Sequence, residues 1–302
     1  LVSTIVTTVI LCFCGVFLFR SLFGPQLDAF LDNGIEVDVL IGVSAGIANG
    51  ISYISKQKGR SLQIGMKYVS DKRYMGAKYY FKKDNRSFYN IQYVLEMLSK
   101  KPKEDLIDML DMFDEKEFEK SYIDFWATVT NVETGKAEYI KIDDYEKSWQ
   151  VVLASCSLPF MFQPTVIDGK KYMDGGCSDP LPVKFADSLG TDKLIAVLTR
   201  ERAYKKENDT ESKLSSFFFR KYKGFSEVLK IRSSIYNNSR EYLFEKEKKN
   251  EAFVFAPKCT KGWKRSEKNP QSLKKLYDQG YSDAMSKMKE LKEYLSKGDG
   301  EI

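Results

Sequence analysis

Apolar and polar positions follow two periods along the chain, and these periods predict helices and strands in turn. Residues 27–31 place three apolar side chains on one helix face, and the Asn33-Gly34 pair after them is a helix-stop signal. A short β-branched run at residues 37–41 predicts a central strand, and helical spacing resumes over residues 47–56. Residues 60–120 carry mainly the i, i+3, i+4 apolar spacing of amphipathic helices.

The middle of the chain predicts further strands. A hairpin is expected with its turn at residues 133–136, and two short strands are expected around Asp168-Gly169. Between them a helix ends before Pro159, and residues 192–200 form another apolar run typical of a buried strand. Strands that alternate with helices favour a three-layer α/β/α domain with a mostly parallel central sheet. We assign this domain to residues 1–200.

A polar linker follows at about Glu201, and beyond it the pattern is mostly helical. Four residues at helical spacing form one stripe, for which packing in a core is the favoured interpretation: Phe225, Leu229, Arg232 and Tyr236. Residues 251–258 predict one more strand, and residues 269–297 predict a closing helix. Residues 201–302 are therefore expected to form a smaller, mostly helical C-terminal extension.

The N-terminal segment admits two interpretations. Residues 1–19 are all apolar or small and uncharged, which meets the length of a membrane-spanning helix. No basic region precedes them, which argues against a cleavable signal peptide. Val, Ile and Thr dominate residues 2–10, which favours instead a buried first strand followed by a loop.

The chain contains no histidine, and this constrains its chemistry more than any other feature of the composition. A histidine general base, a histidine metal site and a Ser-His-Asp triad are all excluded. The five cysteines are scattered and odd in number, which argues against a disulfide framework and fits a reducing compartment such as the cytoplasm.

Positive charge is concentrated in the C-terminal third. Residues 201–302 carry 24 Lys and Arg against 16 Asp and Glu, a net +8, whereas residues 1–200 carry a net −2. A lysine-rich solvated face is the favoured interpretation, with affinity for an anionic surface as the alternative. Residues 217–225, "FFFRKYKGF", mix aromatic and basic side chains as interfacial segments do, although local packing is favoured for them too.

The segment "VDVLIGVSAGIANGI" contains the candidate nucleophile, Ser44. Gly-x-Ser-x-Gly between a strand and a helix is the arrangement called a nucleophile elbow. Gly42 and Gly46 allow the strand and the helix to approach one another without Cβ clashes. The N–H of Ala45, at the start of the helix, is the candidate oxyanion donor.

A serine nucleophile needs a proton acceptor, and without histidine this leaves a carboxylate or a lysine. Ser-x-x-Lys occurs twice, but such matches are expected by chance in a lysine-rich chain and the accompanying motifs are absent. Asp174 ends a predicted strand, and Gly175 and Gly176 after it let the backbone turn closely around a ligand. Asp174 is the candidate base, with an Asx-type turn carboxylate as the structural alternative.

"GVSAG" together with "ASCSLPFMFQPTVIDGKKYMDGG" resembles the patatin-like phospholipase family. Members use a Ser-Asp dyad instead of a triad. The resemblance covers the chain from about Leu27 to near its end, including a C-terminal extension found in one bacterial subgroup. It implies that Ser44 is the nucleophile and Asp174 the general base of a lipid acyl hydrolase.

One part of the family pattern is missing. Members carry a glycine-rich loop, Gly-Gly-Gly-x-Arg-Gly, after the first strand, and its N–H groups supply most of the oxyanion hole. Here Arg20 has no flanking glycines, and Gly15 stands alone. Residues 1–26 are therefore atypical. Either the protein is a catalytically impaired lipid- or membrane-binding pseudo-enzyme, or these residues are not the native N-terminus.

We expect a serine esterase acting on carboxylic ester bonds of lipids, with no metal, no organic cofactor and no nucleic acid partner. Its partners would be a lipid or acyl-ester substrate and, transiently, a membrane surface. The expected location is the cytoplasm, peripheral to a membrane, with a membrane-spanning segment at residues 1–19 as the alternative. The sequence does not indicate an oligomeric state.

Overall fold

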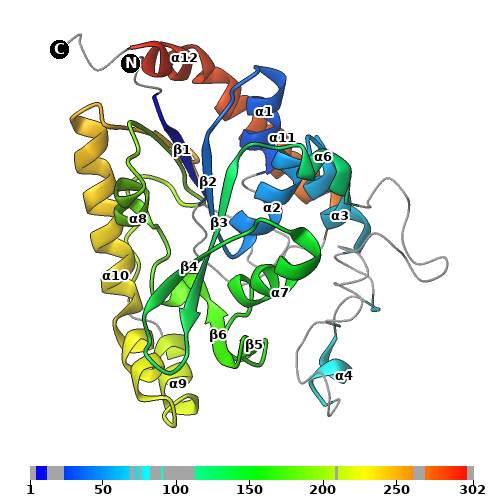
Figure 1. Cartoon of the computed structure of the whole chain (residues 1–302), viewed down its shortest axis with the longest axis vertical. Helices are drawn as coiled ribbons and strands as arrows, with labels where there is room; N and C mark the ends of the chain where they lie inside the picture. The colour runs from blue at the N-terminus through cyan, green and yellow to red at the C-terminus, as the bar shows by residue number, and fades with distance from the viewer. Residues whose placement is uncertain are drawn as a thin grey trace.

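The computed structural model describes residues 5–11, 24–68, 72–73, 76–81, 90, 113–207, 210–260 and 269–297. Eight strands among them form one sheet (Figure 1). They are β1 (Thr7–Leu11), β2 (Val39–Val43), β3 (Asp124–Asn131), β4 (Ala137–Lys141), β5 (Thr165–Ile167), β6 (Lys170–Asp174), β7 (Lys193–Val197) and β8 (Ala252–Phe255).

The centre of the sheet is parallel and one side of it is antiparallel. Strands β3, β2, β1, β7 and β8 lie side by side in that order, and each neighbouring pair is parallel. The hairpin partner β4 pairs antiparallel with one edge of β3. On the other edge, beyond the end of β2, β6 pairs antiparallel with the last residues of β3, and β5 pairs antiparallel with β6. A parallel sheet buried on both faces has strands with nearly continuous apolar runs, as β2 and β7 have.

Helices cover both faces of the sheet. The helices are α1 (Gly24–Asp32), α2 (Ala45–Ile54), α3 (Arg60–Tyr68), α4 (Ala77–Tyr80), α6 (Glu115–Glu119), α7 (Tyr145–Ser155), α8 (Val183–Ser188), α9 (Thr210–Phe218), α10 (Lys223–Lys248), α11 (Pro270–Ser286) and α12 (Met288–Ser296). Val9 and Leu11 of β1 pack with α1, α2, α7 and α12, whereas Ile10 between them packs with α8 and α10. This alternation shows two helical layers around one sheet, and it confirms the predicted three-layer α/β fold.

The turns occur where the sequence predicts them. The β3–β4 hairpin turns at residues 133–136, and Asp168 and Gly169 both have positive φ in the turn between β5 and β6. The predicted closing helix differs, because it is interrupted at Lys287 and forms α11 and α12. Of the helical stretch expected over residues 60–120, the structure describes α3, α4 and α6, and much of the rest lies outside the described residues.

The membrane-spanning interpretation of residues 1–19 is wrong. Residues Thr7–Leu11 form a strand that pairs in parallel with both β2 and β7 near the middle of the sheet. A segment held in a sheet by two neighbours cannot also form a continuous helix across a bilayer. The predominance of Val, Ile and Thr in residues 2–10, which favoured a first strand, predicted this segment correctly.

Within the described part of the chain, we find no helix with the length and apolar character that crossing a bilayer requires.

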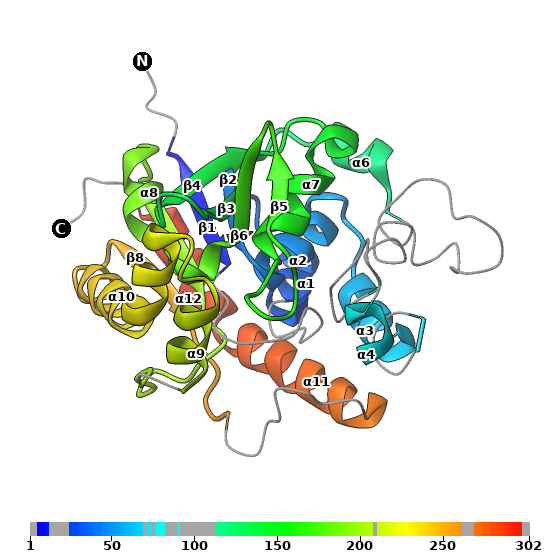
Figure 2. The same cartoon turned by 90° about the horizontal axis from the view of Figure 1, so that it is seen from below.

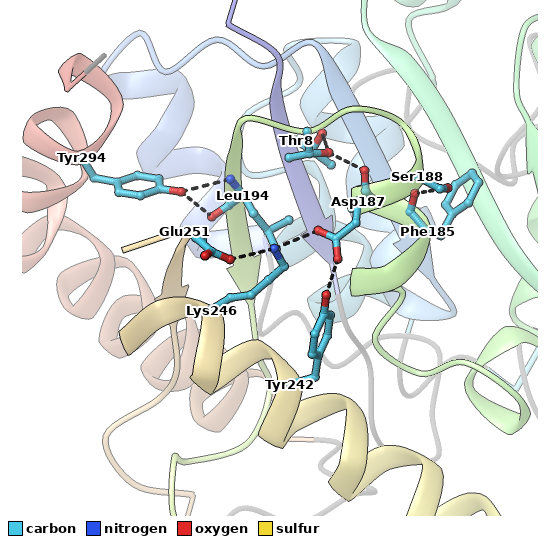
Figure 3. A network of polar contacts seen from close by, with 11 residues as sticks. Thr8, Phe185, Asp187, Ser188, Leu194, Tyr242, Lys246, Glu251 and Tyr294 are labelled. Atoms are coloured by element: carbon cyan, nitrogen blue, oxygen red, sulfur yellow. Dashed lines mark hydrogen bonds and ion pairs between the residues drawn. The ribbon is translucent and has the colours of Figure 1, made fainter. Parts of the chain in front are cut away.

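The C-terminal helices are attached to the sheet by polar contacts as well as by apolar packing (Figure 3). Asp187, in α8, accepts a 2.8 Å hydrogen bond from the Tyr242 hydroxyl and pairs with Lys246 at 3.1 Å. The hydroxyl of Tyr294, in α12, accepts a hydrogen bond of 3.1 Å from the N–H of Leu194 in β7. All four residues of the predicted stripe on α10 are buried, which confirms their assignment to the core.

The turn of the β3–β4 hairpin and the first turn of α10 touch backbone to backbone. A Cβ on Gly224 would lie 2.4 Å from the carbonyl carbon of Thr134, and one on Gly135 would lie 2.2 Å from the oxygen of Gly224. Real Cβ atoms do not approach backbone this closely, so the contact requires glycine on both sides. It holds the start of the C-terminal extension against the sheet.

We expect Gly224→Ala to lower the free energy of unfolding by about 1–3 kcal/mol, because the added methyl group must push the hairpin and α10 apart. Denaturant unfolding followed by circular dichroism measures this. Lys223→Ala is the matched control, since the Lys223 side chain is exposed one position earlier in the same helix. A Gly224→Ala protein as stable as the parent would contradict the proposed contact.

Candidate active site

The site lies where two strand ends meet on one edge of β3. Val43, the last residue of β2, pairs with Thr128, while Asp174, the last residue of β6, pairs with the next residue, Val129. The opposite edge of β3 is occupied at both positions by β4. Strands β2 and β6 therefore run toward one another along the same edge. Their carboxyl ends bring Ser44 and Asp174 together across 130 residues of sequence.

Ser44 occupies a strained turn between β2 and α2. Its φ of 54° and ψ of −121° lie in a region that residues other than glycine rarely adopt. Both neighbouring glycines are needed for close approach: a Cβ on Gly42 would lie 2.6 Å from the Cα of Ile47, and one on Gly46 would lie 2.3 Å from the oxygen of Leu11. The turn has the shape that the Gly-x-Ser-x-Gly pattern predicts.

The Ser44 hydroxyl donates a hydrogen bond of 2.5 Å to Oδ2 of Asp174. The other carboxylate oxygen, Oδ1, accepts a 2.7 Å bond from the N–H of Gly176. Gly175 lies so close to β3 that a Cβ there would be 2.2 Å from the oxygen of Thr128. Both residues of the pair are buried, so the hydroxyl and the carboxylate meet away from bulk water.

Burial raises the pKa of Asp174 to about 6, because an ionised carboxylate loses hydration in this position. The hydrogen bonds from Ser44 and Gly176 act in the opposite direction, as do the positive charges of Arg232 and Lys206. The carboxyl therefore titrates close to neutral pH, which is the range in which a general base is most effective.

Three further side chains hold the two residues in place. The hydroxyl of Ser155, at the end of α7, accepts a 3.1 Å bond from the N–H of Ser44 and donates one of 2.8 Å to the oxygen of Thr128. The thiol of Cys156 donates to the oxygen of Ser44, and Thr130 donates to the backbone oxygen of Asp174. Sequence reasoning placed Ser155 in a family block without a role, and it treated Cys156 only as one of several scattered cysteines.

Lys206 and Arg232 are site residues that sequence reasoning missed. Lys206 lies in the linker and Arg232 in α10, and both are buried. Their positive charges lower the pKa of Asp174. A signal was present, since Arg232 is the one charged residue in the stripe 225, 229, 232 and 236. A cation on an otherwise apolar face calls for a counter-charge, and a buried carboxylate supplies one.

The backbone around Ala45 faces the same region. Ala45 is the first residue of α2, and the first N–H groups of a helix have no carbonyl partner within the helix. Gly46 packs on Leu11, the last residue of β1, so the chain leaves β1 directly beside the Ser44 turn. The segment that follows, where the glycine-rich loop is expected and where Gly15 and Arg20 lie, is outside the described residues.

In the described ranges, no group of three or more Cys, Asp and Glu side chains is arranged to hold a metal ion.

Comparisons with known proteins place this chain in a family. A family model described as "Patatin-like phospholipase" matches residues 18–187, which is more than half of the chain. A second model, described as a domain of unknown function (DUF6363), matches residues 222–296.

Individual relatives are distant, and the chain spans much less than two thirds of their lengths. Lysophospholipase nte1 of Aspergillus niger is 26% identical over 174 residues, which is 57% of this chain and 10% of that protein. The Escherichia coli protein YjjU, described as uncharacterized, is 25% identical over 175 residues, which is 54% of this chain and 43% of that protein. Lysophospholipase NTE1 of Chaetomium globosum is 33% identical over 85 residues, 28% of this chain and 5% of that protein. Together with the three-layer fold, the match over residues 18–187 shows that the chain belongs to the patatin-like phospholipase family.

Proposed function

We propose that this protein is a serine lipid acyl hydrolase in which Ser44 is the nucleophile and Asp174 the general base. The family supports hydrolysis of lipid esters in general. The observation that carries the assignment of residues is the 2.5 Å hydrogen bond from Ser44 to a buried carboxylate, in a chain without histidine.

In the first half of the reaction, Asp174 takes the hydroxyl proton while the Ser44 oxygen attacks the carbonyl carbon of the ester. The Ala45 N–H stabilises the negative charge that develops on the carbonyl oxygen. Asp174 then gives the proton to the departing alcohol as the ester C–O bond breaks, which leaves an acyl-enzyme. In the second half, a water molecule gives its proton to Asp174, attacks the acyl carbon and releases the fatty acid, and the proton returns to Ser44.

We propose lysophospholipids as the substrate class of this protein. Two of the relatives described above carry the name lysophospholipase, and one of them is similar to this chain over 174 residues. The dyad chemistry itself requires only an ester carbonyl.

A second candidate function is that of a lipid-binding pseudo-enzyme. The observation in its favour is the absence of the Gly-Gly-Gly-x-Arg-Gly pattern from residues 12–26. Loss of one oxyanion donor lowers rates by about 10²–10³-fold. A fluorophosphonate probe separates the two functions, because it labels an activated serine: labelling that disappears in Ser44→Ala supports the hydrolase, and an unlabelled parent protein supports the pseudo-enzyme.

We expect Ser44→Ala to abolish hydrolysis of a lysophospholipid and of a soluble short-chain ester. Asp174→Asn is expected to reduce the rate by about 10²–10⁴-fold, since the base is lost while the shape of the side chain is kept. The release of fatty acid or chromophore measures both. Asp168→Asn is the matched control, because Asp168 also precedes a glycine at a strand end but is exposed. Parent-like turnover in Asp174→Asn would refute its assigned role.

The rate is expected to depend on pH through Asp174. Because only the ionised carboxylate accepts a proton, kcat/KM should fall as the pH drops through about 6, the pKa of Asp174. Arg232→Met removes a positive charge that lowers this pKa, so the midpoint of the profile should move to higher pH. Lys230→Met, an exposed lysine two residues earlier in α10, is the control and should leave the midpoint in place. Identical midpoints in all three proteins would contradict the electrostatic role of Arg232.

Asp174→Asn should raise the free energy of unfolding near neutral pH. A variant that is more stable than the parent cannot have lost its activity by unfolding. A carboxyl whose pKa is raised from 3.8 to about 6 binds more protons in the folded state between these values. The free energy of unfolding of the parent therefore falls as the pH rises through that interval, by about 3 kcal/mol. Asp174→Asn lacks this loss. We expect it to be more stable than the parent above pH 6, with the difference declining toward pH 4, and unfolding titrations at both pH values check this.

A further inference from the structure

Helix α9 turns its polar face inward and its apolar face outward, the opposite of an ordinary surface helix. Its inward face carries Ser212, Ser215 and Ser216, which are 2%, 0% and 4% exposed. Its outward face carries three apolar side chains at i, i+3 and i+4 spacing, Leu214, Phe217 and Phe218, which are 50%, 60% and 62% exposed. A surface helix normally buries its apolar stripe and exposes its polar one. We call the three outward residues the α9 apolar face.

The inward serines explain how α9 is held without apolar packing of its own stripe. The hydroxyls of Ser216 and Ser226 lie 2.9 Å apart, and the Ser226 hydroxyl also bonds the backbone oxygen of Ser216. These contacts join α9 to the first turns of α10. Within residues 217–225, Phe219 and Phe225 pack against one another as expected, with rings 5.0 Å apart, whereas Phe217 and Phe218 are mostly exposed.

The α9 apolar face continues into a groove of about 770 Å³. Phe218 forms one wall, and the others include Val166 in β5 and Phe81 after α4, which are 53% and 85% exposed. Figure 1 shows α9, β5 and α4 toward the same lower end of the molecule, and Figure 2 views that end from below. Scattered apolar side chains are normal on a surface, whereas a contiguous patch marks an interaction site.

Three cations border this patch. Arg220 lies 4.7 Å from the ring of Phe217, while Lys221 and Lys171 lie 4.8 and 5.4 Å from the ring of Tyr222. In the described part of the chain, none of the three forms an ion pair with a carboxylate. Their positive charge is therefore available to an anionic partner. We call Lys171, Arg220 and Lys221 the basic rim.

The patch and the candidate active site occupy the same end of the fold. The parallel strands β1 and β2 run downward in Figure 1, and Ser44 follows the carboxyl end of β2. The loop after α7, which begins beside Ser155 and Cys156, contains Phe160, whose ring contacts that of Phe218 at 5.2 Å. The α9 apolar face thus lies next to the loop that leads out of the site.

We propose that the α9 apolar face and the basic rim dock this protein on the surface of an anionic phospholipid bilayer. Aromatic and aliphatic side chains that project outward and are bordered by Lys and Arg match the two layers of such a surface, acyl chains below and phosphates above. Each Lys or Arg near an anionic leaflet adds to the attraction, and this part is screened by salt. The proposal rests on the proposed function, because docking here serves a lipid hydrolase by presenting lipid esters to the end of the sheet that carries Ser44.

Sedimentation with vesicles tests the proposal without requiring turnover. The parent protein should sediment with vesicles of phosphatidylcholine and phosphatidylglycerol in equal parts, and far less with phosphatidylcholine alone or at high salt. Phe217→Ser/Phe218→Ser should weaken binding by more than about tenfold, since two exposed rings are lost. Arg220→Gln/Lys221→Gln should weaken it and reduce its salt dependence.

Matched controls come from elsewhere on the surface. Ile231→Ser removes an apolar side chain of α10 that is 54% exposed and does not line the groove, and Lys248→Gln removes an exposed lysine at the other end of α10. Both should bind vesicles like the parent. Thermal unfolding of every variant shows that the fold is kept, which is expected because the replaced side chains are exposed.

Several results would overturn the proposal. One is a parent protein that stays in solution with anionic vesicles, and another is a Phe217→Ser/Phe218→Ser protein that binds as the parent does. A third is equal binding to neutral and anionic vesicles. A parent that is dimeric without lipid, while the double variant is monomeric, would assign the patch to a second copy of the chain. Ser44→Ala separates this proposal from the proposed function: it should bind vesicles fully, whether or not it has lost hydrolysis of a soluble ester.

Discussion

The pairing of two strands along one edge of β3 is the constraint on which the candidate site depends. Because Val43 and Asp174 pair with consecutive residues of β3, the chain has no freedom to separate Ser44 from the carboxylate. A shift of β6 by one residue would turn Asp174 to the other face of the sheet. Two contacts between the strands oppose such a shift: the Thr130 hydroxyl bonds the backbone oxygen of Asp174, and Gly175 fits against the backbone of Thr128.

A site built this way differs from one that relies on histidine. Imidazole titrates near neutral pH by itself, whereas a carboxyl must be moved there by its surroundings. Here burial provides the shift, and the charges of Arg232 and Lys206 limit it. Since Arg232 belongs to α10, the C-terminal extension contributes to the electrostatics of a site whose two central residues lie in the region that the patatin-like model matches. The pKa of Asp174, at the end of a strand of the sheet, thus depends on a charge from the C-terminal extension.

Local patterns predicted much of the fold and the position of the candidate site. The Ser44 turn could be predicted because its steric demands are met by glycines within five residues, and Asp174 because it stands before two glycines at a strand end. Contacts between distant segments could not be predicted in this way. Nothing near Ser155 in sequence indicates that its hydroxyl meets the N–H of Ser44, 111 residues away. The mix of aromatic and basic residues at 217–225 did not show that Phe217 and Phe218 point outward, because the serines of α9 are small enough to pack inside.

The length and direction of α10 bear on how the molecule would stand on a bilayer. Its 26 residues extend about 39 Å, and in Figure 1 the helix runs along the long axis drawn vertically, away from α9 at the lower end. Contact through α9 would thus be end-on, with a small footprint and most of the protein held clear of the lipid headgroups.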